Sequence, residues 1–138
     1  MTSPRSAPMR ILHIALQGCL KAGSIDYGLT PDTGGHIRYV MELCAANERA
    51  GVEEQIIVTR GFDEPSLGEI YAQHEEQVSA RTRIIRLNGS SSRYLTKEQI
   101  SREIDTLTDR FLSLIENLPQ KPDIIHAHYA DAGRLAIA

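Results

Sequence analysis

Two adjacent glycines, Gly34 and Gly35, close a polar turn that leads directly into an amphipathic helix. Apolar residues then recur at positions 37, 40, 41 and 44, the spacing of one buried helical face. Glycine lets a ligand approach the backbone closely, and the free N–H groups and dipole of a helix N-terminus favour an anion. The pattern indicates a phosphate site. An isolated pair of glycines more often forms only a turn, and in that case Asp32 or Thr33 would be the N-cap of the helix.

A second group of chemistry-bearing residues lies near the end of the chain. His126 and His128 are two apart on a predicted strand, so both imidazoles point to one face, as a metal pair requires. Asp131 offers an oxygen ligand, which leaves a metal-dependent hydrolase as an alternative. We expect no metal, because no further ligand cluster is visible and His13, inside the first strand, reads as a core histidine.

The elements that position these residues alternate along the chain. Apolar or β-branched runs predict strands over 9–16, 55–59, 81–87 and 123–126. Periodic stretches predict helices over 34–50 and 96–118, with capping-box spacing at 66–69 predicting a shorter helix that continues to 78. The last strand is short and apolar, as a central parallel strand would be. Alternating strands and helices predict an α/β fold with a doubly wound, Rossmann-like parallel sheet.

In such a sheet, ligands bind beyond the carboxyl ends of the strands. Gly34 and Gly35 follow the first strand, and residues 126–129 end the fourth. Both segments are therefore expected on one rim. This convergence favours the phosphate site over the plain turn.

Composition describes one soluble domain with a short tail. The 138 residues are 41% hydrophobic and 24% charged, with a net charge of −3, which gives no electrostatic case for binding nucleic acid or an anionic membrane. No segment approaches the length of a membrane span. Two cysteines fit a reduced, cytoplasmic protein. Residues 1–8 read as a disordered tail and 9–138 as the domain.

The end of the chain reads as the beginning of a helix, with Asp131 near its N-cap and no terminator before residue 138. We therefore expect the domain to be truncated at its C-terminal end, as a part of something longer.

Three motifs, in order, match a known pattern. Residues 32–43, DTGGHIRYVMEL, match D-T-G-G-Q-x-x-Y-V-x-E-L; residues 94–98, YLTKE, match Y/F-L-P-K-E; and residues 126–133, HAHYADAG, match H-G-H-Y-A-D-A-G. With these motifs the chain resembles the sucrose-phosphate synthases. These enzymes are retaining glycosyltransferases of the two-lobed GT-B architecture. The resemblance covers nearly the whole chain but only the first part of the family's N-terminal lobe, so it implies an incomplete GT-B lobe.

The resemblance implies transfer of glucose from UDP-glucose to fructose 6-phosphate, with the sugar nucleotide as co-substrate and no other cofactor. The N-terminal lobe mainly holds the acceptor, and the nucleotide-binding lobe is missing from this chain. By position, Gly34 and Gly35 would offer backbone N–H groups where the substrates meet, and His36 stands where the family usually has Gln. Lys97 would bind the phosphate of the acceptor, and Tyr129 would contact its sugar.

His128 and Asp131 lie in the third motif and would line the site without an assigned chemical step. The sequence departs from the family at His36, at Thr96 (usually Pro) and at residues 101–102 (Trp-Pro in plant-type members). Mannosylfructose-phosphate synthases, which use GDP-mannose, resemble the same pattern and remain an alternative. A non-catalytic half-domain that binds a phosphosugar or another protein is a third interpretation, because retaining transfer needs groups from the other lobe.

Overall fold

A five-stranded sheet forms the centre of the molecule in the computed structural model, which describes residues 9–25, 28–30 and 33–137. The strand order is β3-β4-β2-β1-β5. Four strands are mutually parallel, namely β1 (Arg10–Ile14), β2 (Glu54–Gly61), β4 (Thr82–Asn88) and β5 (Ile124–Ala127). The fifth, β3 (Glu75–Ser79), runs antiparallel to β4.

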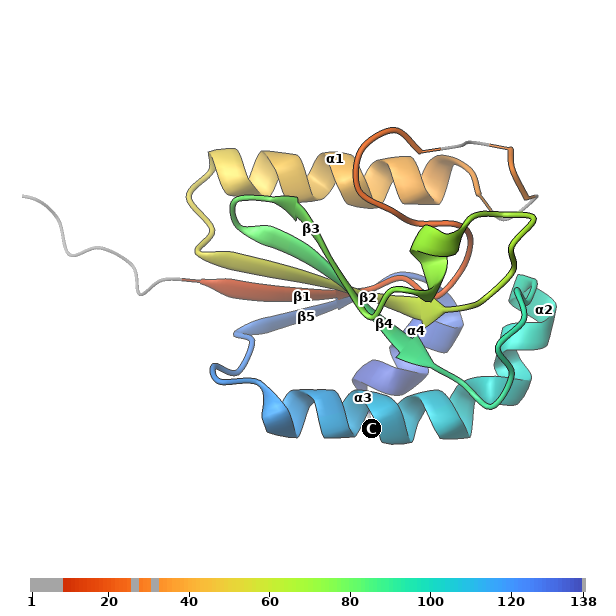
Figure 1. Ribbon diagram of the computed structural model, residues 1–138. Coiled ribbons are helices and arrows are strands. Elements are labelled where there is room, and N and C mark those ends of the chain that lie inside the picture. Colours follow the sequence, from red (N-terminus) through yellow and green to blue (C-terminus); the bar gives the residue numbers. More distant parts are fainter. Residues whose placement is uncertain (1–8, 26–27, 31–32, 138) are drawn as a thin grey trace, which may run out of the picture.

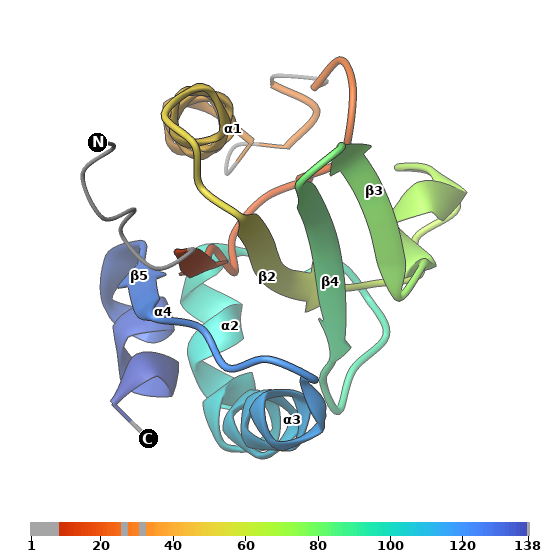
Figure 2. The same cartoon turned by 90° about the vertical axis from the view of Figure 1, so that its left-hand side faces the viewer.

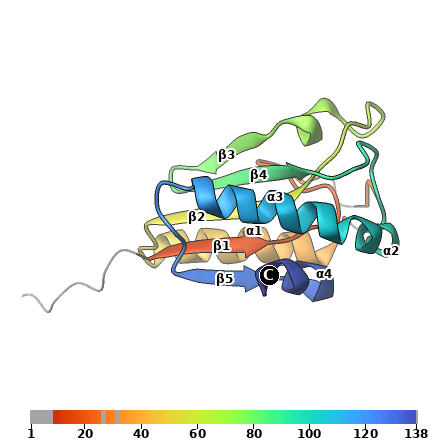
Figure 3. The same ribbon diagram turned by 90° about the horizontal axis from the view of Figure 1, so that it is seen from below.

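Helices cover both faces of this sheet, as a doubly wound fold requires (Figures 1 and 2). On one face lies α1 (Gly35–Arg49); on the other lie α2 (Lys97–Ile100), α3 (Ile104–Asn117) and α4 (Tyr129–Ala136). Figure 3 shows α4 beside β5 at one edge of the sheet and β3 at the opposite edge. The predicted α/β fold is confirmed. Among the described residues, none of the helices has the length and apolar composition needed to cross a bilayer.

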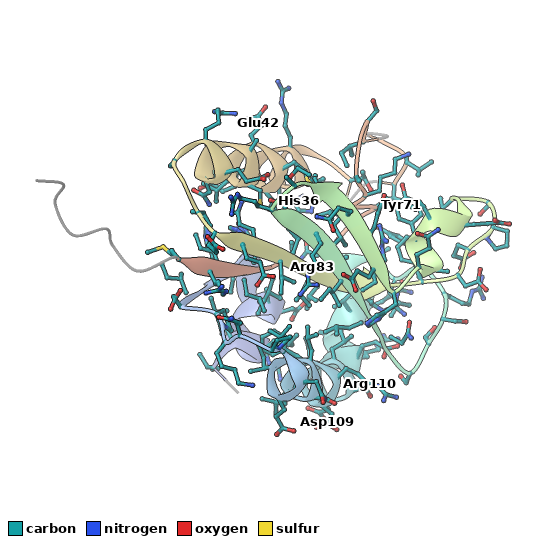
Figure 4. The ribbon with its side chains drawn as sticks, turned by 60° about the vertical axis from the view of Figure 1, so that its left-hand side comes forward. His36, Glu42, Tyr71, Arg83, Asp109 and Arg110 are labelled. Carbon is teal, nitrogen blue, oxygen red and sulfur yellow. The ribbon has the colours of Figure 1, made fainter. Side chains whose placement is uncertain are left out.

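The two faces bury separate apolar clusters. Under α1, Ile37, Val40 and Cys44 pack against Ile57 and Ile84 of the sheet. The other cluster joins α2, α3 and α4 to the opposite face, through Leu12, Ile14, Ile56, Val58, Ile85, Leu87, Ile100, Ile104, Leu107, Phe111 and Leu135 among others. Charged residues such as Glu42 and Asp109 project outward from α1 and α3 (Figure 4). Burial on both faces explains the apolar runs of β1, β2 and β4.

The prediction of a helix over residues 66–78 is wrong. The chain forms a short 3-10 helix, η1 (Glu69–Ala72), and then the strand β3. Gly68 adopts a φ of 125°, which a helix does not allow, and the buried Tyr71 stacks on Phe62 at 5.0 Å between ring centroids. Backbone pairing of β3 with β4 therefore takes precedence over the local capping signal.

The helix predicted over 96–118 is divided by a 3-10 turn, η2 (Ser101–Glu103), into α2 and α3. Its capping box at Thr96 and Gln99 is confirmed. The strand at the end of the chain, predicted to be central, is at the edge of the described sheet, where Ile124 and Ile125 remain 44% and 39% exposed. The helix after it begins at Tyr129, with His128 in the N-cap position, so Asp131 lies in its first turn. Residues 1–8, Asp32 and Ala138 lie outside the described residues.

Candidate functional site

The sheet brings the first and third motifs to one rim. β1 and β5 are parallel neighbours, and their carboxyl ends lead toward α1 and α4. In Figure 1 the strands point toward the side on which α1 begins and α2 lies. The rings of Tyr39 on α1 and His128 after β5 are 6.1 Å apart between centroids. The predicted convergence of the two segments is confirmed, while their roles toward a substrate stay predictions.

The two glycines leave the start of α1 open. Gly34 is the N-cap, and no side chain of the described residues caps this end. Within the described part of the chain, a Cβ built on Gly34 or Gly35 would meet no other atom within 4 Å, and Gly35 is exposed. A ligand can therefore reach the backbone of this helix N-terminus, where the dipole favours an anion.

Thr33 stabilises the preceding loop instead of capping α1. Its buried Oγ1 accepts a hydrogen bond from the backbone N–H of Cys19 at 2.9 Å and lies 2.7 Å from Thr30 Oγ1. Thr30 in turn lies 2.9 Å from the hydroxyl of Tyr94, in the segment before α2. These hydrogen bonds connect the first motif to the second. Sequence spacing alone did not indicate this connection, because the two segments are distant along the chain.

His36, in the first turn of α1, is half-buried and its Nε2 lies 3.2 Å from the carbonyl oxygen of Gln17. The imidazole N–H donates to this carbonyl. His36 thus helps to fix the loop after β1 against the start of α1.

The backbones of Lys97 and Tyr129 begin α2 and α4, both on the rim side of the sheet (Figure 1). Their side chains lie outside the described part of the structure. The contacts expected for them with a phosphosugar therefore stay predictions.

A buried ion pair holds the segment that leads to α2. Arg60 donates to the carbonyls of Ser91 and Arg93 at 2.6 and 2.7 Å, and its guanidinium lies 3.9 Å from Glu103. Glu103 accepts hydrogen bonds from the backbone N–H groups of Ser90 and Ser91 at 2.6 and 2.9 Å. Burial opposes ionisation of Glu103, but these hydrogen bonds and Arg60 together hold its pKa below the ordinary value. No sequence motif predicted this pair, which connects β2 to the end of η2.

Three histidines gather beside the rim, on the side of the sheet that α1 covers. His13 pairs with His126 in the β1–β5 register, and the rings of His126 and His128 are 4.2 Å apart between centroids. One nitrogen from each of the three rings lies within 4.8 Å of the others. The expectation that no further ligand cluster exists is therefore wrong, because strand pairing adds His13. Among the described residues, Asp131 does not join this group.

Burial favours the neutral forms of His13 and His128. Burial, together with the neighbouring His126, His13 and His36, lowers the pKa of His128 to about 4. Burial also lowers the pKa of His13, although its hydrogen bond to Gln55 opposes the change. Each neutral ring keeps one nitrogen lone pair.

Comparison with known proteins finds similarity to sucrose-phosphate synthases. No family model matches the chain. It is 29% identical to sucrose-phosphate synthase 4 of Arabidopsis thaliana, across 95% of this chain and 15% of that protein. Against sucrose-phosphate synthase of Spinacia oleracea the identity is also 29%, across 89% of this chain and 14% of that protein. The chain is homologous to sucrose-phosphate synthases.

A solved structure shares the fold. A sucrose-phosphate synthase from Thermosynechococcus elongatus superposes with a TM-score of 0.73 at 21% identity, covering 94% of this chain and 29% of the other. The described residues thus share the fold of part of that chain. The chain spans about 15% of the length of the curated sucrose-phosphate synthases that it matches. Homology to these transferases does not favour the hydrolase alternative.

Proposed function

We propose that this chain is the acceptor-binding N-terminal part of a retaining glycosyltransferase that moves glucose from UDP-glucose to fructose 6-phosphate. Homology over 95% of the chain to sucrose-phosphate synthase 4 of Arabidopsis thaliana supports this function. The observation that carries it is the meeting of the open helix N-terminus at Gly34 and Gly35 with the end of β5 on one rim.

The arrangement suits a phosphorylated acceptor. Backbone N–H groups at Gly34 and Gly35 attract an anion where the donor diphosphate and the acceptor meet. Lys97, at the start of α2, adds a flexible point charge for the phosphate of the acceptor, and Tyr129 adds a hydroxyl for its sugar. His36, His128 and Asp131 complete the lining. The sugar nucleotide is held by a second lobe, which this chain does not contain.

The residues of this chain say less about the donor than about the acceptor, because the nucleotide of the donor binds in the second lobe. The mannosylfructose-phosphate synthase alternative differs in the donor, with GDP-mannose in place of UDP-glucose. Donor choice therefore separates the two candidates without changing the expectation for the acceptor.

The test is transfer by the complete protein that contains this segment. Purified protein is incubated with fructose 6-phosphate and either UDP-glucose or GDP-mannose, and the products are separated by anion exchange and identified by mass. Sucrose 6-phosphate from UDP-glucose is the expected product, and unphosphorylated fructose should be a poor acceptor. Product from GDP-mannose alone would favour the alternative, and no transfer from either donor would contradict the proposed function.

A further inference from the structure

A buried glutamine, Gln55, determines which ring nitrogen of His13 carries the hydrogen. The Nε2 group of Gln55 donates to the carbonyl of Cys44 at 2.7 Å and to Thr82 Oγ1 at 3.2 Å. Its amide oxygen must therefore be the acceptor, and it receives the N–H groups of Asn47 and of His13 Nε2, both at 3.0 Å. Because Nε2 of His13 carries the hydrogen, Nδ1 keeps its lone pair.

That lone pair has no partner among the described residues. His13 is fully buried, and its Nδ1 makes no hydrogen bond; Nε2 of His128 is likewise buried and unpaired. Buried polar atoms are nearly always paired, so two unpaired nitrogens in one cluster need an explanation. A bound ligand that accepts lone pairs would satisfy both.

We propose that His13, His126 and His128 form a binding site for a divalent transition-metal ion of borderline hard–soft character. Among such ions, Zn²⁺ fits best. Three imidazoles with a free fourth position are an established zinc arrangement, whereas Mg²⁺ and Ca²⁺ prefer oxygen ligands. One nitrogen of each ring lies within 4.8 Å of a nitrogen of each of the other two. Zn–N bonds of about 2.0–2.1 Å place ligand nitrogens about 3.3 Å apart in a tetrahedron, so small rotations of the rings close the site.

Gln55 contacts a proposed metal ligand, not the metal itself, and orients that ligand. A metal-binding histidine almost always donates its other ring N–H to an oxygen, which orients the ring and selects the nitrogen that binds. Gln55 does this for His13, and is itself held by α1 and β4. The site is thus oriented from the buried side and does not depend on the proposed transferase function.

The test uses the 138-residue chain prepared without a polyhistidine tag and freed of metal by a chelator. Zn²⁺ is titrated in competition with a chromogenic chelator, and Co²⁺ is added separately as a spectroscopic substitute. One equivalent of Zn²⁺ should bind, Co²⁺ should give the intense visible absorption of a tetrahedral site, and excess Mg²⁺ should displace neither.

Two variants assign the binding to this cluster. His126→Ala should weaken Zn²⁺ binding at least tenfold and remove the tetrahedral Co²⁺ spectrum. Gln55→Leu should weaken binding about 10- to 100-fold, as loss of an outer partner does. His74→Ala is the matched control, because His74 lies outside the cluster, with its Nδ1 3.1 Å from the carbonyl of Arg86.

Circular dichroism verifies that each variant is folded, and His126→Ala carries the decision if Gln55→Leu does not fold. Equal Zn²⁺ affinity of His126→Ala and His74→Ala would overturn the proposal. Binding of less than one equivalent to the unaltered chain, or displacement by Mg²⁺, would overturn it as well.

Discussion

At the scale of single residues, the proposed transferase site depends on two glycines, Gly34 and Gly35, because they have no side chains. Gly34 and Gly35 begin α1 with open space where side chains would stand. Neither needs glycine to avoid a collision within the described structure. Their value is that a ligand meets backbone N–H groups directly. The Gly-Gly pair and the order of strands predicted both this site and its neighbours at the end of the last strand, and the β1–β5 register confirms that the two segments meet.

Gly35→Ala should lower substrate affinity without lowering the stability of the fold. Alanine favours a helix over glycine by about 1 kcal/mol, so thermal or urea unfolding should show equal or slightly higher stability. The added methyl group occupies the approach to the helix N-terminus, so affinity of the complete protein for its substrates should fall at least tenfold, as calorimetry would measure.

Gly133→Ala is the matched control, since Gly133 lies within α4 and a Cβ there also meets no atom within 4 Å. It should leave substrate affinity unchanged. Equal affinity in Gly35→Ala and Gly133→Ala would contradict a ligand site at the start of α1.

At the scale of elements, the buried pair of Arg60 and Glu103 positions the start of α2. Glu103→Gln removes a charge that accepts several hydrogen bonds, so the free energy of unfolding at neutral pH should fall by about 1.5–3 kcal/mol. The folded pKa of Glu103 lies below its ordinary 4.5, so the unfolded chain takes up this proton first. The stability from Glu103 is therefore complete above about pH 4.5 and is lost as the pH falls through the folded pKa.

The measurement is urea unfolding of both proteins at a series of pH values from neutral to about pH 3. The difference in free energy of unfolding should shrink as the pH falls. Glu98→Gln, an exposed carboxylate in the first turn of α2, is the control and should differ little from the unaltered chain. A difference for Glu103→Gln that stays constant down to pH 3 would contradict the assigned role.

Elements with strong periodicity were predictable, whereas contacts between distant segments were not. The helix α1 and the strands β1, β2 and β4 follow apolar patterns that local physics determines. The stretch 66–78 has a capping-box spacing and helical periodicity, yet β3 forms because pairing with β4 satisfies its backbone. His13 and His126 become neighbours only through the β1–β5 register, which no local spacing encodes. The part of His13 in the histidine cluster and the buried ion pair could not be predicted from the sequence for this reason.

At the scale of the whole molecule, the proposed function assigns to this chain one side of a two-sided reaction. The chain spans about 15% of the length of sucrose-phosphate synthase 4 of Arabidopsis thaliana, and 29% of the solved chain from Thermosynechococcus elongatus. Transfer with retention needs preorganised charge around the departing diphosphate and the reacting sugar. In the proposed function, the described rim binds the anionic acceptor at Gly34 and Gly35, whereas the residues that bind the nucleotide belong to the second lobe.

The 138 residues alone should therefore bind fructose 6-phosphate weakly and transfer no glucose. In the measurement, equal concentrations of the 138-residue chain and of the complete protein receive UDP-glucose and fructose 6-phosphate, and sucrose 6-phosphate is quantified by mass spectrometry over hours. Only the complete protein should form product, because binding an acceptor without stabilising the developing charge does not lower the barrier. Product from the short chain above the enzyme-free control would mean that the groups on this rim suffice for transfer, and the division of labour between two lobes would be wrong.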